Sequence, residues 1–261
     1  MGDDPWAELV RGRYQAAGLE TTHLVVHPAS GTPVTIVLVD ESGERSFVFE
    51  LGAAADFGAE VCLARRDLFQ RSRAVLYGYY ALVPTRDAEI ATILQAAKAA
   101  GCLTALDAAG DGGRLDPLRT ILPFCDIYFP SLAEARHQTG LADPAAILAC
   151  FRAAGAAGIV GLKLGAAGAL VSERPGDVRR IAPVAPPGPV VDTTGAGDAF
   201  RGGLAAGCLR APEGEVEDLL RYANAVAALN CRGLGARGGM PTAHEVDDLL
   251  FARASFEVLD S

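Results

Sequence analysis

A carboxylate stands directly behind a glycine-rich turn in residues 192–200, which read Asp-Thr-Thr-Gly-Ala-Gly-Asp-Ala-Phe. Gly195 and Gly197 lack a Cβ, so the backbone around Ala196 can curl and point successive N–H groups at an anion. The apolar run that follows predicts a helix, and Asp198 falls in its first turn, near the positive end of the helix. A bound phosphate would then lie beside a carboxylate that can accept a hydroxyl proton. The spacing predicts phosphoryl transfer to an alcohol, with these four residues as the catalytic ones.

The alternative is an ordinary glycine-rich connection in which Asp198 is only a helix-start carboxylate. At ordinary residue usage, two Asp and two Gly at four fixed places match by chance about once in 10⁵ starting positions. The longer stretch 192–205, with Gly202 and Gly203, resembles the second signature of the ribokinase-like (PfkB) carbohydrate kinase family. Further segments fall in the family's order over almost the whole chain, at 2–4, 43–46, 126–134, 163–165 and 235–241.

The resemblance implies an enzyme that transfers the γ-phosphoryl group of ATP to a hydroxyl of a sugar or related polyol, with Asp198 as general base. It implies an α/β fold of the ribokinase-like type, with three layers, a mostly parallel central sheet and a small antiparallel β lid. We expect one domain over 1–261, with the lid strands inserted at about 20–52. The cofactors implied are ATP and Mg²⁺, with K⁺ as a further possibility, and the expected assembly is a homodimer formed through the lid.

Glu134 is the candidate Mg²⁺ residue, because the family usually has Asn-x-x-Glu here and its Glu acts on the metal through water. In this chain Ser131 replaces the Asn. A capping box, with Ser131 at the cap and Glu134 at the third helical position, is an alternative that is compatible with the metal role.

The candidate nucleotide-binding residues lie in two segments. Lys163, Gly165 and Gly168 resemble the family's strand-to-hairpin segment near the nucleotide phosphates, although a tight β-turn would also require glycine. Asn224 and Gly235 resemble the adenine-side helix and loop, where a plain glycine-rich connector is the alternative.

Asp192 and Thr194 resemble the monovalent-cation site that many members use to order the anion-binding turn. Hard oxygen ligands would suit K⁺. The alternative is that Asp192 only caps the turn.

Composition is that of an ordinary globular protein, with 50% apolar and 21% charged residues in 261. A net charge of -9, with scattered basic residues, argues against nucleic-acid and anionic-membrane partners. No apolar run approaches the length of a membrane span, and residues 1–4 lack the features of a signal peptide. The widely spaced cysteines form no Cys-x-x-Cys pair, so we expect reduced thiols and a cytoplasmic location.

The pattern of apolar residues differs between the first part of the chain and the part beyond residue 70. Residues 5–17 have the apolar spacing of an amphipathic helix, and residues 22–50 are rich in Val, Thr and Ile and predict two or three antiparallel strands with turns at 30–31 and 41–43. Beyond residue 70, strands are predicted at 74–79, 103–107, 126–129 and 159–164, and helices at 87–100 and 144–154. This alternation predicts a parallel sheet covered by helices, with ligands at the carboxyl ends of its strands.

One departure from the family concerns the start of the chain. Members normally carry a substrate-binding Asp and a Gly-Gly-x-x-x-Asn segment, which grips the sugar, before the Gly-Asp-Asp that stands here at 2–4. A start codon placed too late, a truncated form, and a member that has lost sugar binding all explain this pattern. The alternative function is therefore a catalytically idle nucleotide-binding member. Ribose, fructose, 2-keto-3-deoxygluconate and nucleosides all stay open as acceptors.

Overall fold

The structure is a computed structural model that describes residues 1–41, 45–83 and 87–257, without the side chains of Arg45 and 252–257. The turn expected at 41–43 and part of the 43–46 segment lie outside the described residues. The α-helices are α1 (Pro5–Ala16), α2 (Ala59–Leu63), α3 (Arg66–Arg71), α4 (Asp87–Ala99), α5 (Leu115–Ile121), α6 (Leu132–Thr139), α7 (Pro144–Ala153), α8 (Ala196–Arg210), α9 (Val216–Asn230) and α10 (Ala243–Glu257). The strands are β1 (Val34–Val39), β2 (Arg45–Glu50), β3 (Ala74–Tyr77), β4 (Leu103–Leu106), β5 (Ile127–Tyr128), β6 (Ile159–Lys163), β7 (Ala169–Ser172) and β8 (Arg179–Ile181), and short 3-10 helices lie at Gly52–Asp56, Tyr80–Leu82, Leu122–Phe124 and Gly165–Ala167.

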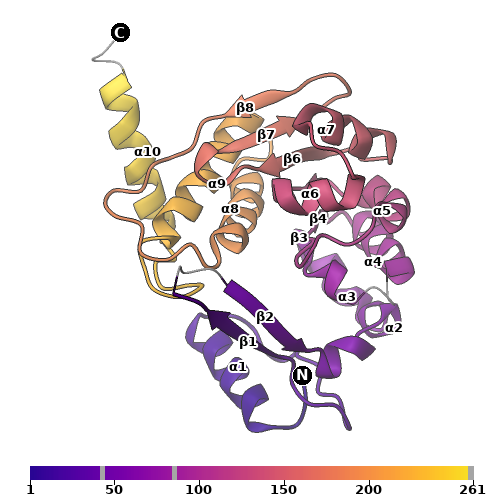
Figure 1. Cartoon of the computed structure of the whole chain (residues 1–261). Helices are drawn as coiled ribbons and strands as arrows, with labels where there is room; N and C mark the ends of the chain where they lie inside the picture. The colour runs from indigo at the N-terminus through magenta and orange to yellow at the C-terminus, as the bar shows by residue number, and fades with distance from the viewer. Residues whose placement is uncertain (42–44, 84–86, 258–261) are drawn as a thin grey trace.

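The six-stranded sheet has the order β3-β4-β5-β6-β7-β8 (Figure 1). β3 to β6 pair in parallel, whereas β7 and β8 continue the sheet as antiparallel strands. The mostly parallel sheet predicted from the alternating pattern is confirmed. Each predicted parallel strand ends one or two residues early, because the chain turns out of the sheet there and forms the loops described below.

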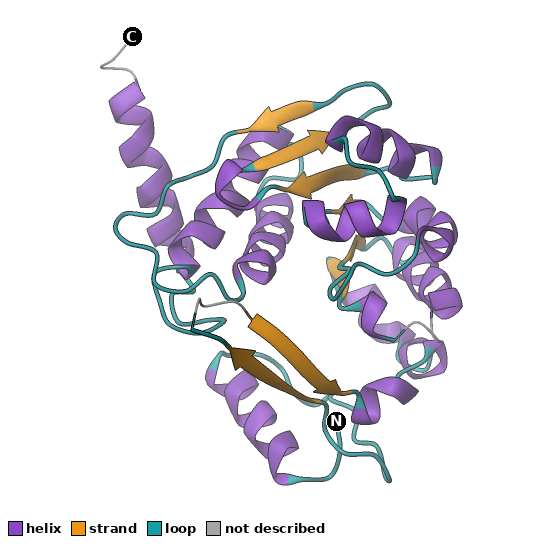
Figure 2. Ribbon diagram, in the orientation of Figure 1, coloured by secondary structure: helices purple, strands orange, loops and turns teal. Residues whose placement is uncertain are grey.

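Helices cover both faces of this sheet (Figure 2), which makes the three layers that were predicted. One face packs α4, α5, α6 and α7 around buried side chains such as Leu106, Tyr128 and Val160. The other face packs α8 and α9 around Ala105, Ile127 and others. The side chains of adjacent residues in one strand are thus buried on opposite faces of the sheet, because side chains alternate along a strand. Two apolar faces explain why these strands read as almost continuous apolar runs.

β1 and β2 form a separate two-stranded antiparallel sheet, in register from Val34 opposite Glu50 to Val39 opposite Arg45. Two strands are within the expected two or three, and residues 22–33 contain none. Their apolar side chains are more than a third exposed on both faces of this sheet, namely Val34, Ile36, Val37, Leu38, Val39, Phe47, Val48 and Phe49.

α1 confirms the helix expected at 5–17, with Asp4 as its N-cap. The Asp4 carboxylate accepts from the Ala7 N–H and from both the N–H and the hydroxyl of Thr32, which joins the helix to the segment before β1. Its apolar face is not buried in a core, since Trp6 is 57% exposed. Figure 1 explains this result, because α1 lies beside β1 and β2 and away from the six-stranded sheet. None of the helices in the described ranges is both long and apolar enough to cross a bilayer.

Packing against the sheet fixes the start of α8. Phe200, in the first turns of that helix, contacts Phe129 at the end of β5, with ring centroids 5.5 Å apart. Both rings are almost fully buried. Burial of an aromatic side chain contributes on the order of 2 kcal/mol, so this contact holds the helix start close to the carboxyl ends of the strands.

Candidate active site

A cavity of about 710 Å³ lies between the carboxyl ends of the parallel strands and the start of α8. Tyr79 follows β3, Ala109 follows β4, Ser131 follows β5 and Lys163 ends β6, and each contributes to its wall. The location is the one expected for an open α/β sheet, and the volume is within the range of small-molecule sites. Tyr79 and Ala109 are also the non-glycine residues with positive φ in the described ranges, at 60° and 65°. Strained backbone of this kind concentrates at functional sites.

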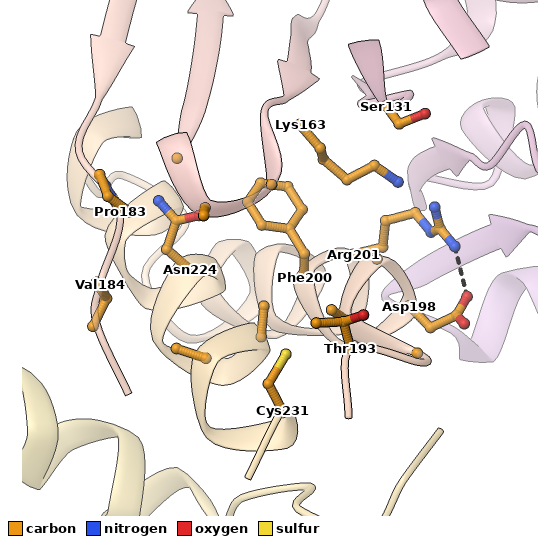
Figure 3. Close-up of a pocket in the computed structure, with 18 of the residues that line it drawn as sticks. Ser131, Lys163, Pro183, Val184, Thr193, Asp198, Phe200, Arg201, Asn224 and Cys231 are labelled. Atoms are coloured by element: carbon orange, nitrogen blue, oxygen red, sulfur yellow. Dashed lines mark hydrogen bonds and ion pairs between the residues drawn. The ribbon is translucent and has the colours of Figure 1, made fainter. Parts of the chain in front are cut away.

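The two ends of the cavity differ in chemistry (Figure 3). One end is formed by aliphatic and small side chains of the 183–190 segment, of α9 and of the residue after it, including Pro183, Val184 and Cys231. The other end holds the charged side chains of Lys163 and Arg201, with Asp198 beyond them. The arrangement suits a ligand with an uncharged ring at one end and anionic groups at the other.

Most of the residues predicted from sequence line this one cavity. They are Glu134, Lys163, Gly165, Gly168, Gly195, Ala196, Gly197, Asp198 and Asn224. Asp192, Thr194 and Gly235 are outside its lining and support the turn from behind, as described below. The structure therefore gathers residues from four separate segments of the sequence around one space.

The glycine-rich turn has the conformation that an anion site requires. Gly195 is the N-cap of α8 with φ 75°, and a Cβ at this position would lie 2.2 Å from the Ala236 carbonyl oxygen. The Ala196 N–H donates to the Thr193 carbonyl oxygen at 3.2 Å. The N–H groups of Gly197 and Asp198 have no partner among the described residues. The positive end of α8 therefore presents donors to the charged end of the cavity.

Lys163 brings an ammonium group to the same place. Its Nζ atom is 3.4 Å from the point that a Cβ of Gly197 would occupy. In the part of the chain that the structure describes, no carboxylate forms an ion pair with it. Burial is the main cause that lowers the pKa of Lys163, and the charge of Arg201 lowers it further. An unpaired ammonium above a helix N-terminus is a strong anion-binding combination.

Asp198 stands in the first turn of α8, as predicted, and its side chain is about half exposed. Its Oδ1 atom accepts from Arg201 Nη2 at 2.6 Å and from the Tyr79 hydroxyl at 3.0 Å. Burial, followed by the charge of Asp198, raises the pKa of Tyr79 to about 12, so this hydroxyl keeps its proton and acts as the donor.

Ser131 and Glu134 form a capping box at the start of α6, which is the alternative given from the sequence. The Ser131 hydroxyl accepts from the Glu134 N–H at 3.2 Å, and Glu134 Oε2 accepts from the Ser131 N–H at 2.6 Å. Oε1 has no partner in the described ranges, and Glu134 lines the cavity. The cap accounts for one carboxylate oxygen and leaves the other without a partner among the described residues.

Asp192 joins two loops behind the turn. One carboxylate oxygen accepts from the Thr194 N–H at 2.8 Å and the other accepts from the Gly235 N–H at 2.9 Å. At the apolar end of the cavity, Asn224 Nδ2 donates to the Ala182 carbonyl oxygen at 3.1 Å, which holds the 183–190 segment against α9. Both side chains thus have a structural role at the edge of the cavity.

Sequence reasoning missed several residues of the cavity. Arg201 carried a signal, because Asp-x-x-Arg places two opposite charges on one face of a helix. The proline-rich segment 183–190 has no chemically reactive side chain to mark it, yet several of its residues form the apolar wall. Tyr79 and Cys231 gave no local signal, since only the fold brings them here.

The PfkB family, described as "pfkB family carbohydrate kinase", matches this chain over residues 1–243. A ribokinase from Haemophilus influenzae is 28% identical over 96% of this chain and 79% of its own length. The structure of Arabidopsis thaliana ribokinase complexed with ribose and ATP superposes with a TM-score of 0.82 at 24% identity, over 96% of this chain and 80% of that one. A putative ribokinase II from E. coli, in complex with ATP and Mg²⁺, gives 0.79 at 23% identity, over 97% and 81%.

The three layers, a mostly parallel sheet between helices, define a ribokinase-like α/β fold. The chain belongs to the PfkB family of carbohydrate kinases. The resemblance inferred from the 192–205 signature is confirmed by a match that covers residues 1–243.

Proposed function

We propose that this chain transfers the γ-phosphoryl group of ATP to a hydroxyl of a small sugar or polyol, with Asp198 as the general base. One observation carries the proposal: Asp198, the donors of the α8 turn and the Lys163 ammonium meet at the charged end of one cavity. Phosphoryl transfer needs little covalent chemistry from a protein and depends on positioning and charge stabilisation. These groups supply both.

The nucleotide would lie along the cavity. Its base would contact the apolar end, where Pro183 and Val184 face α9, and its phosphates would reach the turn at Gly195 and Gly197. The acceptor would approach Asp198 from the side of β1 and β2. Relatives that are named as ribokinases and fructokinases support a sugar as the acceptor.

In the reaction, the acceptor hydroxyl gives its proton to the Asp198 carboxylate while its oxygen forms a bond to the γ-phosphorus. The bond between that phosphorus and the β,γ-bridging oxygen breaks, and ADP leaves with the electron pair. The N–H groups of Gly197 and Asp198, together with Lys163, stabilise the charge on the transferring group. The proton then passes from Asp198 to solvent after the products leave.

The residues present fit a nucleotide-bound Mg²⁺. Glu134 lines the cavity, and its Oε1 atom has no hydrogen-bond partner in the described ranges, so this side chain could act through water on an ion held mainly by phosphates. When bound, Mg²⁺ would neutralise charge on the ATP oxygens.

For K⁺, we propose Asp192 and Thr194 as ligands. A titration of the kinase activity with K⁺, compared with the same titration with Na⁺, tests this proposal.

Replacing Lys163 with Met is expected to raise the KM for ATP about 10-fold or more, because a buried charge-assisted contact contributes about 1.5–3 kcal/mol. The lowered pKa of Lys163 adds a pH test. As the pH rises, the ammonium loses its proton below the ordinary lysine range, so the affinity for ATP decreases on the alkaline side. This decrease is expected to be absent from the Met variant.

The sequence supplies a matched control, because Lys98 is the other lysine of the chain. It pairs with Asp126 on the surface, away from the cavity. Lys98→Met is expected to keep the KM for ATP and its pH dependence. Equal effects of the two substitutions would contradict the role given to Lys163.

The proposed activity is tested by coupled ADP release with Mg²⁺ and K⁺ against a panel of ribose, fructose, 2-keto-3-deoxygluconate and nucleosides. Acceptor-dependent ADP release, with equimolar phosphorylated product, supports the kinase. Calorimetric binding of ATP without turnover of any acceptor, in this chain and in an upstream-extended form, would instead indicate the catalytically idle member. The compartment that suits ATP and the free cysteines is the cytoplasm.

We also propose a homodimer through the lid sheet formed by β1 and β2. Four apolar side chains lie on one face of it, Val34, Ile36, Leu38 and Val48. Four more lie on the other face, Val37, Val39, Phe47 and Phe49. An isolated two-stranded sheet is marginally stable in water, and one face suffices to cover the acceptor, which leaves the other for a second copy.

The dimer is tested with one substitution on each face. We expect the wild-type chain to sediment as a dimer and one of the two variants, Ile36→Glu or Phe47→Glu, to sediment as a monomer, because a buried unpaired carboxylate opposes association. The variant that stays dimeric serves as the control. A monomeric wild type, or two dimeric variants, would contradict the proposal.

A further inference from the structure

Four side chains at the charged end of the cavity are joined by ion pairs and a hydrogen bond. Arg201 Nη1 pairs with Asp107 Oδ1 at 2.5 Å, and Arg201 Nη2 pairs with Asp198 Oδ1 at 2.6 Å. The Tyr79 hydroxyl donates to the same Asp198 oxygen. These residues come from the loops after β3 and β4 and from α8, so the cluster connects the sheet to the helix that carries the proposed base. Figure 3 shows the contact between Arg201 and Asp198.

The two oxygens of Asp198 are not equivalent. Oδ1 accepts from Arg201 and Tyr79, whereas Oδ2 accepts no hydrogen bond in the described part of the chain. Two donors on one oxygen restrict rotation of the carboxylate. One oxygen is thereby held, and the other is left for a reacting hydroxyl.

Arg201 is itself held firmly. Its side chain is 10% exposed, and its partner Asp107 is 2% exposed. Burial raises the pKa of Asp107, and the charges of Arg201 and Lys163 oppose that rise. A planar guanidinium that contacts two carboxylates uses the fixed fork of arginine, which a lysine ammonium cannot reproduce.

Arg201 also affects Lys163. Its Nη1 atom is 3.8 Å from the point that a Cβ of Gly197 would occupy, and Lys163 Nζ is 3.4 Å from the same point. Without the guanidinium, the ammonium would be the remaining cation beside Asp107 and Asp198 and would be drawn to them. Arg201 forms an ion pair with each carboxylate and so leaves Lys163 for an anionic ligand.

We propose that Arg201 is a positioning residue, anchored on Asp107, that fixes Asp198 so that Oδ2 is the oxygen presented to the acceptor hydroxyl. This inference rests on the kinase function proposed above and adds a residue to it. Arg201 does not touch the reacting atoms. It sets the orientation of the base and keeps the lysine available.

The kinetic test uses Arg201→Met, which keeps the length of the side chain and removes its charge. We expect kcat to decrease about 30-fold while the KM for the acceptor stays within twofold, because misplacing a catalytic group costs rate rather than binding. Arg201→Lys is expected to recover part of kcat. In an Asp198→Asn background, Arg201→Met is expected to cause no further loss, because both substitutions remove the same positioned base.

Arg210→Met is the matched control. Arg210 lies on the same helix and also pairs with a carboxylate, Asp247, but on the surface. It is expected to keep kcat. An Arg201→Met enzyme with wild-type kcat, a loss confined to KM, or an additive loss with Asp198→Asn would overturn the proposal.

Crystal structures of the wild type and Arg201→Met, grown under the same conditions, test the proposal without activity. We expect Asp198 to leave its single orientation in the variant. An unchanged carboxylate, with Oδ2 in its original direction, would overturn the positioning role. A wild-type chain that phosphorylates no acceptor would refute the proposed function, and the two structures would still decide the role of Arg201.

Discussion

Asp198→Asn is expected to lower kcat about 10³-fold while the Kd for ATP stays within a few-fold. General-base catalysis typically contributes 10²–10⁴ in rate, and the amide cannot take the acceptor proton. The substitution keeps the shape of the side chain, and an amide oxygen can still accept from Arg201. ATP binding is retained because it depends on the α8 turn and Lys163 rather than on this carboxylate.

The measurement is ADP release at saturating ATP and acceptor, combined with calorimetric titration of ATP. Asp116→Asn is a suitable control, because Asp116 is also in the first turn of a helix but is on the surface of α5. It is expected to behave as the wild type. Turnover by Asp198→Asn near the wild-type rate would exclude Asp198 as the base.

The glycine-rich turn and Asp198 could be predicted from sequence because their chemistry is local. Gly195 requires a positive φ, and the residues that follow it start a helix, so the signature and the geometry are the same short stretch. The capping box at Ser131 and Glu134 was predictable for the same reason, since its two hydrogen bonds join residues three apart.

Other parts of the site could not be predicted, because they depend on long-range contacts. The contact of Tyr79 with Asp198 joins residues 119 positions apart. It exists because β3 and α8 meet at one end of the sheet. The same holds for Asp107, an acidic residue behind a strand, because its pairing with Arg201 comes from the fold.

The amphipathic spacing of residues 5–17 correctly predicted a helix, but it does not predict whether the apolar face of that helix is buried. Trp6, Leu9 and Tyr14 repeat at helical spacing, yet all three are exposed. Periodicity reports that one face of the helix is apolar, not what covers that face. The helix lies beside β1 and β2 (Figure 1), whose apolar side chains are likewise exposed.

Gly195→Ala is expected to destabilise the chain by about 3 kcal/mol and to weaken ATP binding at least 10-fold. A left-handed conformation costs an L-residue about 1 kcal/mol, and overpacking against a neighbour that cannot move costs about 2 kcal/mol more. The neighbour here is the Ala236 carbonyl oxygen, 2.2 Å from the added Cβ. Relief of that clash requires the turn to open, and its N–H groups then no longer converge on the phosphate.

Gly235→Ala separates the two causes, because Gly235 also has a positive φ, 82°, but a Cβ there meets no atom within 4 Å. We expect it to cost only the conformational part, about 1 kcal/mol, and to keep its N–H bond to Asp192 and the wild-type affinity for ATP. Urea unfolding and ATP titration of both variants provide the comparison. Equal losses in the two variants would show that backbone conformation alone determines the turn, and the close approach of residues 195 and 236 would then have no part in phosphate binding.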